Sequence, residues 1–155
     1  MSKCLITGTF DPLTIGHEAV IKRALTVFDH VAVAILVNPD KETMFSVEER
    51  IRMVKSVFGE KVEVFYSDGW AVDAAKETHA DVLVRGIRGE GDLSYEEEMA
   101  RYNRDHGVET VFFFAEAGLT EVTSTAVRTA LEAGTDVKDY LSEDVYRLVT
   151  EYRGK

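Results

Sequence analysis

The chain has 155 residues and a mass of 17.3 kDa, with 45% hydrophobic and 30% charged residues, as expected for one globular domain with a full core. It has no apolar run long enough to span a bilayer and no signal-peptide pattern, and its single cysteine, Cys4, suits a reducing cytoplasm, so we expect neither a membrane nor a secreted protein. A net charge of −10 leaves no strong basic face, which argues against a nucleic-acid partner but not against a small anionic ligand.

Segments typical of β-strands alternate with helical patterns along the whole chain. Several of the strand segments are nearly continuous apolar runs, which is typical of strands covered on both faces. The predicted strands are residues 3–7, 31–37, 62–66, 81–85 and 110–114, and the predicted helices are residues 17–28, 47–58, 70–78, 95–103, 124–132 and 143–152. This alternation predicts an α/β fold with a doubly wound, five-stranded parallel sheet, formed by residues 1–155 as one domain.

Capping residues support several of these helix boundaries. Ser46 and Glu49 have the spacing of a capping box, and Ser142 precedes an acidic first turn. Gly134 follows a helical pattern and suits a left-handed C-cap.

The segment after the first predicted strand carries the strongest functional signal. Parallel sheets bind ligands at the carboxyl ends of their strands, and here the chain runs through GTFDPLTIGH, residues 8–17, into a helix. Gly16 at the helix entrance gives a phosphate access to free amides, and Thr9 and His17 can donate hydrogen bonds to it. An equally open interpretation is a tight turn with Thr14 as a cap and His17 on the surface. The pattern of a P-loop is absent.

GTFDP followed by Thr14, Ile15, Gly16 and His17 resembles the nucleotidylyltransferase superfamily, in which a TxGH or HxGH signature binds the nucleotide triphosphate. This resemblance implies a Rossmann-like nucleotidylyltransferase fold for residues 1–155 and a reaction class, but it leaves the acceptor open.

A second segment narrows the resemblance. By themselves, Arg85 and Arg88 around a glycine at a strand end are either phosphate ligands or solvated loop charges. Read together with residues 89–104, however, the segment resembles the phosphopantetheine adenylyltransferase family, whose pattern is RG(L/I)R, then D, YE and M, ending in NR. Lys41 and the serine-rich segment at residues 123–125 also match this family, and the resemblance extends from Cys4 to about Tyr152.

The resemblance implies transfer of AMP from ATP to 4′-phosphopantetheine, giving dephospho-coenzyme A and pyrophosphate by in-line attack without a covalent intermediate. It implies that the catalytic residues are His17, Thr9, Lys41 and Arg88. It implies ATP contacts from Thr9, Phe10, His17, Gly86, Ile87, Arg88, Glu96, Leu119, Thr120, Glu121, Val122, Thr123, Ser124 and Thr125. The acceptor would contact Thr9, Lys41, Ala71 and Arg85. Mg²⁺ is expected to arrive with ATP, without protein metal ligands, and the family implies a homohexamer.

The sequence departs from the family pattern at three places, one of which is the serine triplet, read here as Thr-Ser-Thr at residues 123–125. Thr7 stands where the family usually has proline, and residues 119–122 lack the aromatic residue often found near the adenine. Trp70 lies where the family lines its pantetheine pocket, although a core position is the ordinary alternative. Phe112, Phe113 and Phe114 are expected in the sheet core, and His30, His79 and His106 on the surface.

Three other functions remain open from the residues. The same chemistry with another acceptor or nucleotide would give a nicotinamide mononucleotide adenylyltransferase or a cytidylyltransferase. A nucleotide-binding module without catalysis is a second possibility. A flavodoxin-like signalling domain suits the fold alone and leaves the His17 segment unexplained.

Overall fold

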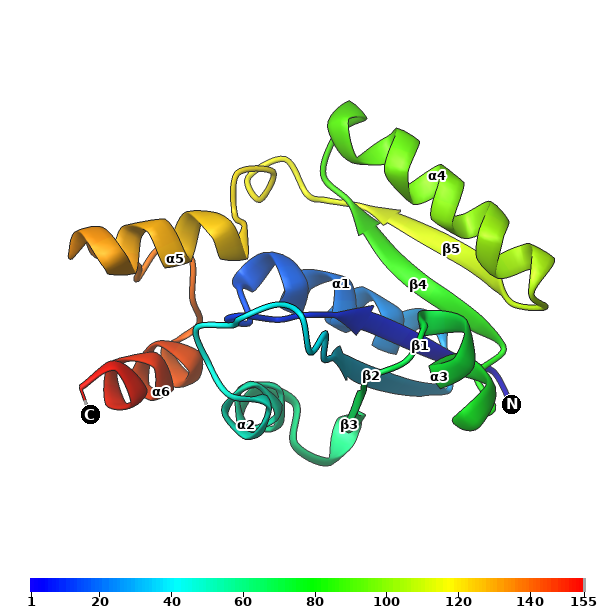
Figure 1. Ribbon diagram of the computed structural model, residues 1–155, viewed down its shortest axis with the longest axis horizontal. Helices are drawn as coiled ribbons and strands as arrows, with labels where there is room; N and C mark the ends of the chain where they lie inside the picture. The colour runs from blue at the N-terminus through cyan, green and yellow to red at the C-terminus, as the bar shows by residue number, and fades with distance from the viewer. Residues whose placement is uncertain (155) are drawn as a thin grey trace.

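A parallel five-stranded sheet forms the centre of the computed structural model, which describes residues 1–154 (Figure 1). The strand order is β3-β2-β1-β4-β5, and every neighbouring pair is parallel. The strands are β1 (Lys3–Gly8), β2 (His30–Leu36), β3 (Glu63–Ser67), β4 (Val82–Ile87) and β5 (Glu109–Phe114). The predicted α/β fold with a doubly wound sheet is confirmed.

Six α-helices follow the strands in the predicted sequence of elements. They are α1 (Ile15–Val27), α2 (Val47–Phe58), α3 (Ala71–Glu77), α4 (Glu90–Asp105), α5 (Ser124–Ala133) and α6 (Glu143–Arg153), with a short 3₁₀ helix, η1 (Gly59–Lys61), after α2. The capping box is formed, since Glu49 N–H donates to Ser46 Oγ over 3.1 Å and Ser46 N–H to Glu49 Oε1 over 2.9 Å. Gly134 ends α5 at φ 75°, in the left-handed region where glycine is favoured.

Alternate residues of the central strands pack into two cores, one on each face of the sheet. Cys4 and Ile6 of β1 join the core beneath α1 and α2, whereas Leu5 joins the core with α3. Cys4 is fully buried, and burial raises the pKa of its thiol to about 12, so it is neutral and unsuited to act as a nucleophile. Within residues 1–154, no helix combines the length and apolar character that crossing a bilayer requires.

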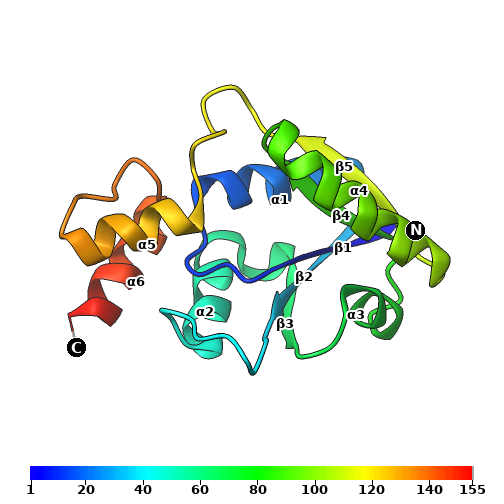
Figure 2. The same ribbon diagram turned by 45° about the horizontal axis from the view of Figure 1, so that its top comes forward.

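The last two helices lie beyond the end of the sheet towards which the strands point (Figures 1 and 2). Val127 of α5 and Val149 of α6 enter the same core as α1 and α2. The loop before α6 also binds the start of α1, because Ile15 N–H donates to Tyr140 O over 3.0 Å. Ser142 precedes α6 as predicted, but its hydroxyl donates to the buried carboxylate of Glu18 over 2.7 Å instead of capping the helix.

Two details differ from the sequence prediction, and the structure decides one alternative, the position of Trp70. Helix α4 begins at Glu90 and not near residue 95, because Glu90 and Asp92 place negative charge in the first turn, where the helix dipole favours it. Phe114 is 64% exposed, since it ends the edge strand β5, and so it is not in the sheet core. Trp70 is 58% exposed and stacks on Tyr102 with a centroid separation of 5.3 Å, so it is not a core tryptophan.

Candidate active site

A cavity of about 740 Å³ opens at the carboxyl ends of β1 and β4. In the strand order β3-β2-β1-β4-β5, the connections run outwards in opposite directions from these two central strands. The cavity therefore lies at the topological switch point, where open α/β sheets bind ligands. The turn after β1, the start of α1, the loop after β4 and the start of α5 all contribute to its wall.

The turn from β1 to α1 is tightly built around Phe10. Its backbone has φ 52°, in the left-handed region that an aromatic residue rarely adopts, and its side chain is only 3% exposed. A Cβ on Gly8 would lie 3.0 Å from the Phe10 ring, so the absence of a side chain at Gly8 allows this packing. The ring edge contacts His17 with a centroid separation of 4.9 Å. Phe10 therefore restrains the orientation of His17.

Thr14 and His17 form a reciprocal cap at the start of α1. His17 N–H donates to Thr14 Oγ1 over 3.3 Å, and Thr14 N–H donates to His17 Nδ1 over 3.0 Å. Because Nδ1 accepts this hydrogen bond, the proton of the neutral ring is on Nε2. Burial lowers the pKa of His17 to about 4, with further lowering by the charges of Arg88 and Arg85. The site therefore contains a neutral imidazole whose Nε2–H is available as a donor.

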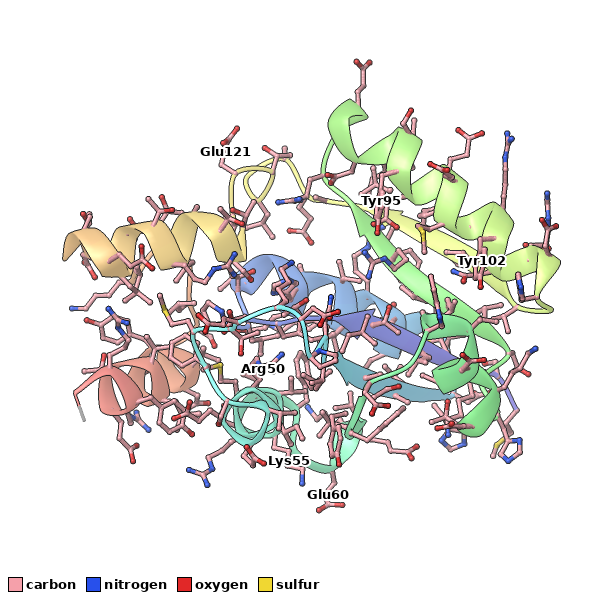
Figure 3. All side chains as sticks on the ribbon, viewed as in Figure 1. Arg50, Lys55, Glu60, Tyr95, Tyr102 and Glu121 are labelled. Carbon is pink, nitrogen blue, oxygen red and sulfur yellow. The ribbon has the colours of Figure 1, made fainter. Side chains whose placement is uncertain are left out.

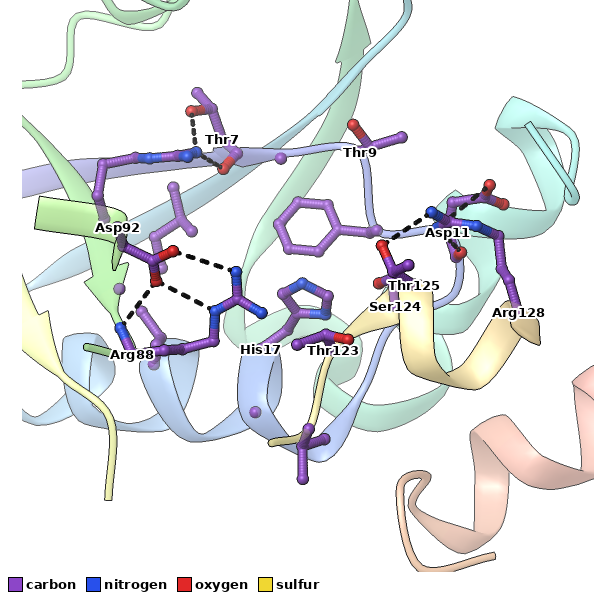
Figure 4. Close-up of a pocket in the computed structure, with 18 of the residues that line it drawn as sticks. Thr7, Thr9, Asp11, His17, Arg88, Asp92, Thr123, Ser124, Thr125 and Arg128 are labelled. Carbon is purple, nitrogen blue, oxygen red and sulfur yellow. Dashed lines mark hydrogen bonds and ion pairs between the residues drawn. The ribbon is translucent and has the colours of Figure 1, made fainter. Parts of the chain in front are cut away.

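Arg88 lies beside His17 and is paired with Asp92 (Figure 4). Its Nε donates to Asp92 Oδ2 over 3.2 Å, and its backbone N–H donates to the same oxygen over 3.0 Å. Burial acts to raise the pKa of Asp92, but the hydrogen bonds and the charge of Arg88 outweigh it and hold that pKa below its ordinary value. Asp92 therefore fixes a cationic donor at the cavity wall.

Arg85 is held by protein groups on three sides. It donates to Glu96 from Nε over 3.0 Å and from Nη2 over 2.7 Å, and from Nη1 to Thr7 O over 2.7 Å. Burial by itself lowers the pKa of Arg85, but the carboxylate of Glu96 reverses this and raises it. Thr7, the residue at the departure from the family pattern, also accepts from Arg85 through Oγ1 over 3.3 Å.

The start of α5 brings a helix N-terminus to the cavity. Thr123 Oγ1 accepts from Ala126 N–H over 2.9 Å and caps the helix, while Ser124 Oγ donates to Pro12 O over 2.8 Å and attaches α5 to the β1–α1 turn. Arg128 donates to Thr125 Oγ1 and to Asp11 O, over 3.2 and 2.7 Å. Backbone amides at a helix start, together with a nearby arginine, suit an anionic ligand.

A smaller cavity of about 340 Å³ adjoins the first and shares Thr9, Lys41 and Thr43 with it. Its other lining residues include Trp70 and the segment after β2. The two cavities therefore meet at Thr9, Lys41 and Thr43.

The structure brings most of the predicted site residues to one cavity wall. Those that line the larger cavity are Thr9, Phe10, His17, Lys41, Arg85, Gly86, Arg88, Glu96, Leu119, Val122, Thr123, Ser124 and Thr125. Four others do not line it: Ile87 is buried, Ala71 packs against the core with α3, and Thr120 and Glu121 are exposed. Figure 3 shows Glu121 pointing outwards from the β5–α5 loop.

Sequence reasoning missed several charged residues of this region, among them Glu42, Glu132 and Arg153 in the cavity wall. Asp11, Asp92 and Arg128 line the cavity, and Arg50 donates to the backbone of the β1–α1 turn. Asp11, Asp92 and Arg128 all lie inside the motif segments that carry the family resemblance, which was the available signal. Arg50 also ends a segment, residues 44–50, that resembles the family, but its contacts could not be predicted because they join carbonyl groups from three separate segments.

Known proteins resemble this chain in sequence over nearly its whole length. A family model described as cytidylyltransferase-like matches residues 5–130. The phosphopantetheine adenylyltransferase of Phocaeicola vulgatus is 42% identical over 146 residues, which cover 92% of this chain and 97% of that protein. That of Cereibacter sphaeroides is 38% identical, over 96% of this chain and 98% of its own length. The chain belongs to the phosphopantetheine adenylyltransferase family.

Solved structures of other adenylyltransferases share the fold of this family member. A bifunctional NMN adenylyltransferase/ADP ribose pyrophosphatase from Francisella tularensis superposes with a TM-score of 0.75 at 17% identity, over 99% of this chain and 50% of that one. A putative nicotinate-nucleotide adenylyltransferase from Vibrio parahaemolyticus superposes with a TM-score of 0.68 at 20% identity, over 97% of this chain and 93% of that one. A further structure of the Francisella protein contains AMP and manganese.

The donor set of the cavity does not suit a metal ion held by protein ligands alone. Among residues 1–154, no three His, Cys, Asp or Glu side chains are arranged to bind one. The cavity carboxylates of Asp11, Asp92 and Glu96 already accept hydrogen bonds from backbone amides or arginines.

Proposed function

We propose that the protein transfers AMP from ATP to 4′-phosphopantetheine, giving dephospho-coenzyme A and pyrophosphate. The observation that carries this proposal is the meeting of a neutral His17, Arg88 and the α5 N-terminus with Thr9 and Lys41 around one cavity. The imidazole, the guanidinium and the helix N-terminus suit a nucleoside triphosphate. The hydroxyl of Thr9 and the ammonium of Lys41 suit an acceptor phosphate. The family of the chain supports the same reaction.

The reaction exchanges one bond at the α-phosphorus of ATP. An oxygen of the acceptor phosphate attacks this atom, and the bond to the oxygen bridging to the β-phosphate breaks, with its electron pair leaving on pyrophosphate. The acceptor oxygen is already anionic, so alignment and cancellation of charge matter more than a general base. His17 Nε2–H would donate to an α-phosphate oxygen as charge develops, and Thr9 would orient the attacking phosphate.

The remaining cations divide between the two substrates. Arg88 and the amides at the start of α5 would bind the triphosphate, since they lie on the His17 side of the cavity. Lys41 would hold the acceptor phosphate where the two cavities meet, and the pantetheine arm would then extend into the smaller cavity beside Trp70. Arg85 is proposed as a second acceptor ligand, and its pairing with Glu96 would have to loosen or be shared on binding.

Mg²⁺ is proposed to enter as part of the nucleotide. The described residues offer no group of three metal ligands, so phosphate oxygens and water would hold the ion. The manganese ion with AMP in the Francisella protein is consistent with a divalent ion accompanying the nucleotide.

The decisive experiment measures pyrophosphate release from ATP and Mg²⁺ with and without 4′-phosphopantetheine, in the wild type and in His17→Ala. We expect release that depends on the acceptor and falls by about 10²–10³ in kcat in the variant, the typical effect of losing one preorganised donor. Near-full activity of a folded His17→Ala protein would refute the assigned role.

The same assay separates the alternative functions. Release with nicotinamide mononucleotide in place of 4′-phosphopantetheine, or with CTP in place of ATP, would change the substrate and keep the chemistry. ATP binding without release with any of these acceptors would favour a non-catalytic nucleotide-binding module.

Three further properties are proposed from the family resemblance. Residues 1–155 would form a single nucleotidylyltransferase domain, and six copies would assemble as a homohexamer, which light scattering would detect as about six times 17.3 kDa. The lone, buried Cys4 is consistent with a reducing cytoplasm as the location.

A further inference from the structure

Asp11 is a buried carboxylate that binds two backbone amides of the loop after β2. It is 3% exposed. Its Oδ2 accepts from Met44 N–H and its Oδ1 from Phe45 N–H, both over 2.9 Å. Asp11 lies in the β1–α1 turn, two residues after Thr9, so it joins that turn to the end of the loop that contains Lys41.

Arg50 binds the same loop from the other side. It is also 3% exposed, and Figure 3 shows its position on α2. Nε donates to Phe45 O over 3.1 Å and to Ser46 O over 3.3 Å, while Nη1 donates to Thr9 O over 2.9 Å and, more weakly, to Leu36 O over 3.4 Å. Within the described chain, all hydrogen bonds of this guanidinium go to main-chain carbonyls.

These contacts fix both ends of the Lys41 loop. Residues 37–43 lie between the Leu36 carbonyl and the amides of Met44 and Phe45, so the loop is attached before and after Lys41. The same two side chains hold the β1–α1 turn, Asp11 as part of it and Arg50 through Thr9 O. Hence the placement of Lys41 relative to Thr9 depends on the buried side chains of Asp11 and Arg50. Both bind Phe45, Asp11 at its N–H and Arg50 at its carbonyl oxygen.

We propose that Asp11 and Arg50 are positioning residues that set the separation of Thr9 and Lys41, and with it the affinity for the acceptor phosphate. This inference rests on the proposed function, because it takes Thr9 and Lys41 as ligands of that phosphate.

The chemistry of the pair favours positioning over simple stabilisation. A buried charge is costly to desolvate, and apolar side chains of similar volume often stabilise a core as well or better. Burial does lower the pKa of Arg50, in line with such a cost. In return, a carboxylate and a guanidinium bind several peptide groups of irregular loops in a fixed geometry, which no apolar residue can do.

The test compares Asp11→Asn and Arg50→Lys with two controls in the full-length protein. An asparagine keeps the volume of Asp11 but turns one NH₂ towards an amide N–H, and a lysine ammonium cannot reach Thr9 O and Phe45 O with the fork of an arginine. Arg52→Lys is the matched control on the same helix, because Arg52 donates to Tyr152 Oη over 3.3 Å and does not line either cavity. Val145→Ala in α6 is a control for loss of stability in the core.

We expect KM for 4′-phosphopantetheine to rise at least tenfold in Asp11→Asn and Arg50→Lys, with KM for ATP changing less than threefold in Arg50→Lys. Arg50→Lys carries the comparison of the two substrates, because Asp11 also lies 3.8 Å from Arg128 in the wall assigned to the triphosphate. Neither control should show this difference between the two substrates. Equal changes in both KM values of Arg50→Lys, or the same difference in Val145→Ala, would overturn the proposal. Arg50→Met provides a third variant if the others do not fold.

Amide hydrogen exchange provides a readout that does not depend on the reaction. The amides of Met44 and Phe45 should exchange at least tenfold faster in Asp11→Asn than in the wild type and Val145→Ala. If the wild type does not use 4′-phosphopantetheine at all, the proposed function fails while faster exchange still supports the two-sided attachment of the loop. Unchanged exchange refutes that attachment whatever the substrate.

Discussion

At the scale of single residues, His17 shows how a capping interaction sets a protonation state. Its Nδ1 accepts from Thr14 N–H, and burial lowers its pKa from 6.5 to about 4. We therefore expect an imidazole signal that titrates near pH 4, with the neutral ring protonated on Nε2. Nitrogen NMR of the ligand-free protein measures both the pKa and the tautomer of the ring. The signal of His17 is identified as the one that disappears in His17→Asn. A midpoint near 6.5 would contradict the neutral-donor role.

The same shift predicts how stability depends on pH. The unfolded chain protonates this imidazole near pH 6.5, and the folded chain does so only near pH 4. Between these values the unfolded state binds more protons than the folded state. The contribution of the neutral His17 to the free energy of unfolding is therefore fully present above pH 6.5 and is lost as the pH falls to 4. Its size is on the order of 2 kcal/mol, since one pKa unit corresponds to about 1.4 kcal/mol and the cavity side of the ring is partly solvated.

Urea unfolding at pH 7 and pH 4.5 tests this contribution. His17→Asn should lose less free energy of unfolding over this interval than the wild type. His79→Asn, at an exposed position, should behave like the wild type. Parallel losses in wild type and His17→Asn would show that His17 is not kept neutral by folding.

Motif residues differ in how far the sequence alone could predict their role. His17, Arg88 and Thr123 carry their signal locally, and the structure brings all three to the cavity. Asp11 and Arg50 also lie in matched segments, but their contacts join backbone groups from distant parts of the chain, which no local pattern predicts. Arg85 was expected to be available for a phosphate, but its pairing with Glu96 depends on where α4 begins.

At the scale of elements, the close approach of α1 to β4 depends on Gly86. A Cβ there would lie 2.9 Å from Val20 Cγ2 of α1. Gly86→Ala should lower the free energy of unfolding by about 1–3 kcal/mol through overpacking. Combining it with Val20→Ala should recover part of that loss, which a double-mutant cycle in urea would measure.

Gly91 is the matched control for this prediction. It lies in the first turn of α4, and a Cβ there would meet nothing within 4 Å. Gly91→Ala should be neutral or stabilising by about 0.5 kcal/mol, because alanine reduces the freedom of the unfolded chain. Equal destabilisation by both substitutions would show that the contact with Val20 is not the cause.

Element types were easier to predict than boundaries and order. Apolar runs such as residues 31–37 identified the strands, and the Ser46 cap identified the start of α2. Two glycines near the start of α4 concealed its first turn, which the acidic residues favour. The strand order could not be predicted, because it depends on which faces α1 to α4 cover, and alternating strands and helices fit several orders.

At the scale of the whole molecule, an acidic protein binds an anionic ligand only through local positive charge. The net charge is −10, yet Arg88, Lys41, Arg128 and Arg153 all line the larger cavity. Helix N-termini of α1 and α5 add partial positive charge at the same place. Arg85 lines the cavity as well, and the five cations are matched by five carboxylates, those of Asp11, Glu42, Asp92, Glu96 and Glu132. Anion binding therefore depends on which donors face the ligand and not on an excess of positive charge, and the site joins segments from both halves of the chain.

A ligand that contacts these segments together should stabilise the entire fold. ATP with Mg²⁺ at about 100 times its dissociation constant should add about 2.7 kcal/mol, because it binds only the folded state. For a chain of this size the midpoint of thermal unfolding should rise by roughly 5–10 °C. Arg88→Gln should lose most of this shift at the same ATP concentration, whereas Arg147→Gln, on the exposed face of α6, should retain it. An undiminished shift in Arg88→Gln would mean that the triphosphate binds elsewhere, and calorimetric titration of both variants would confirm the difference in affinity.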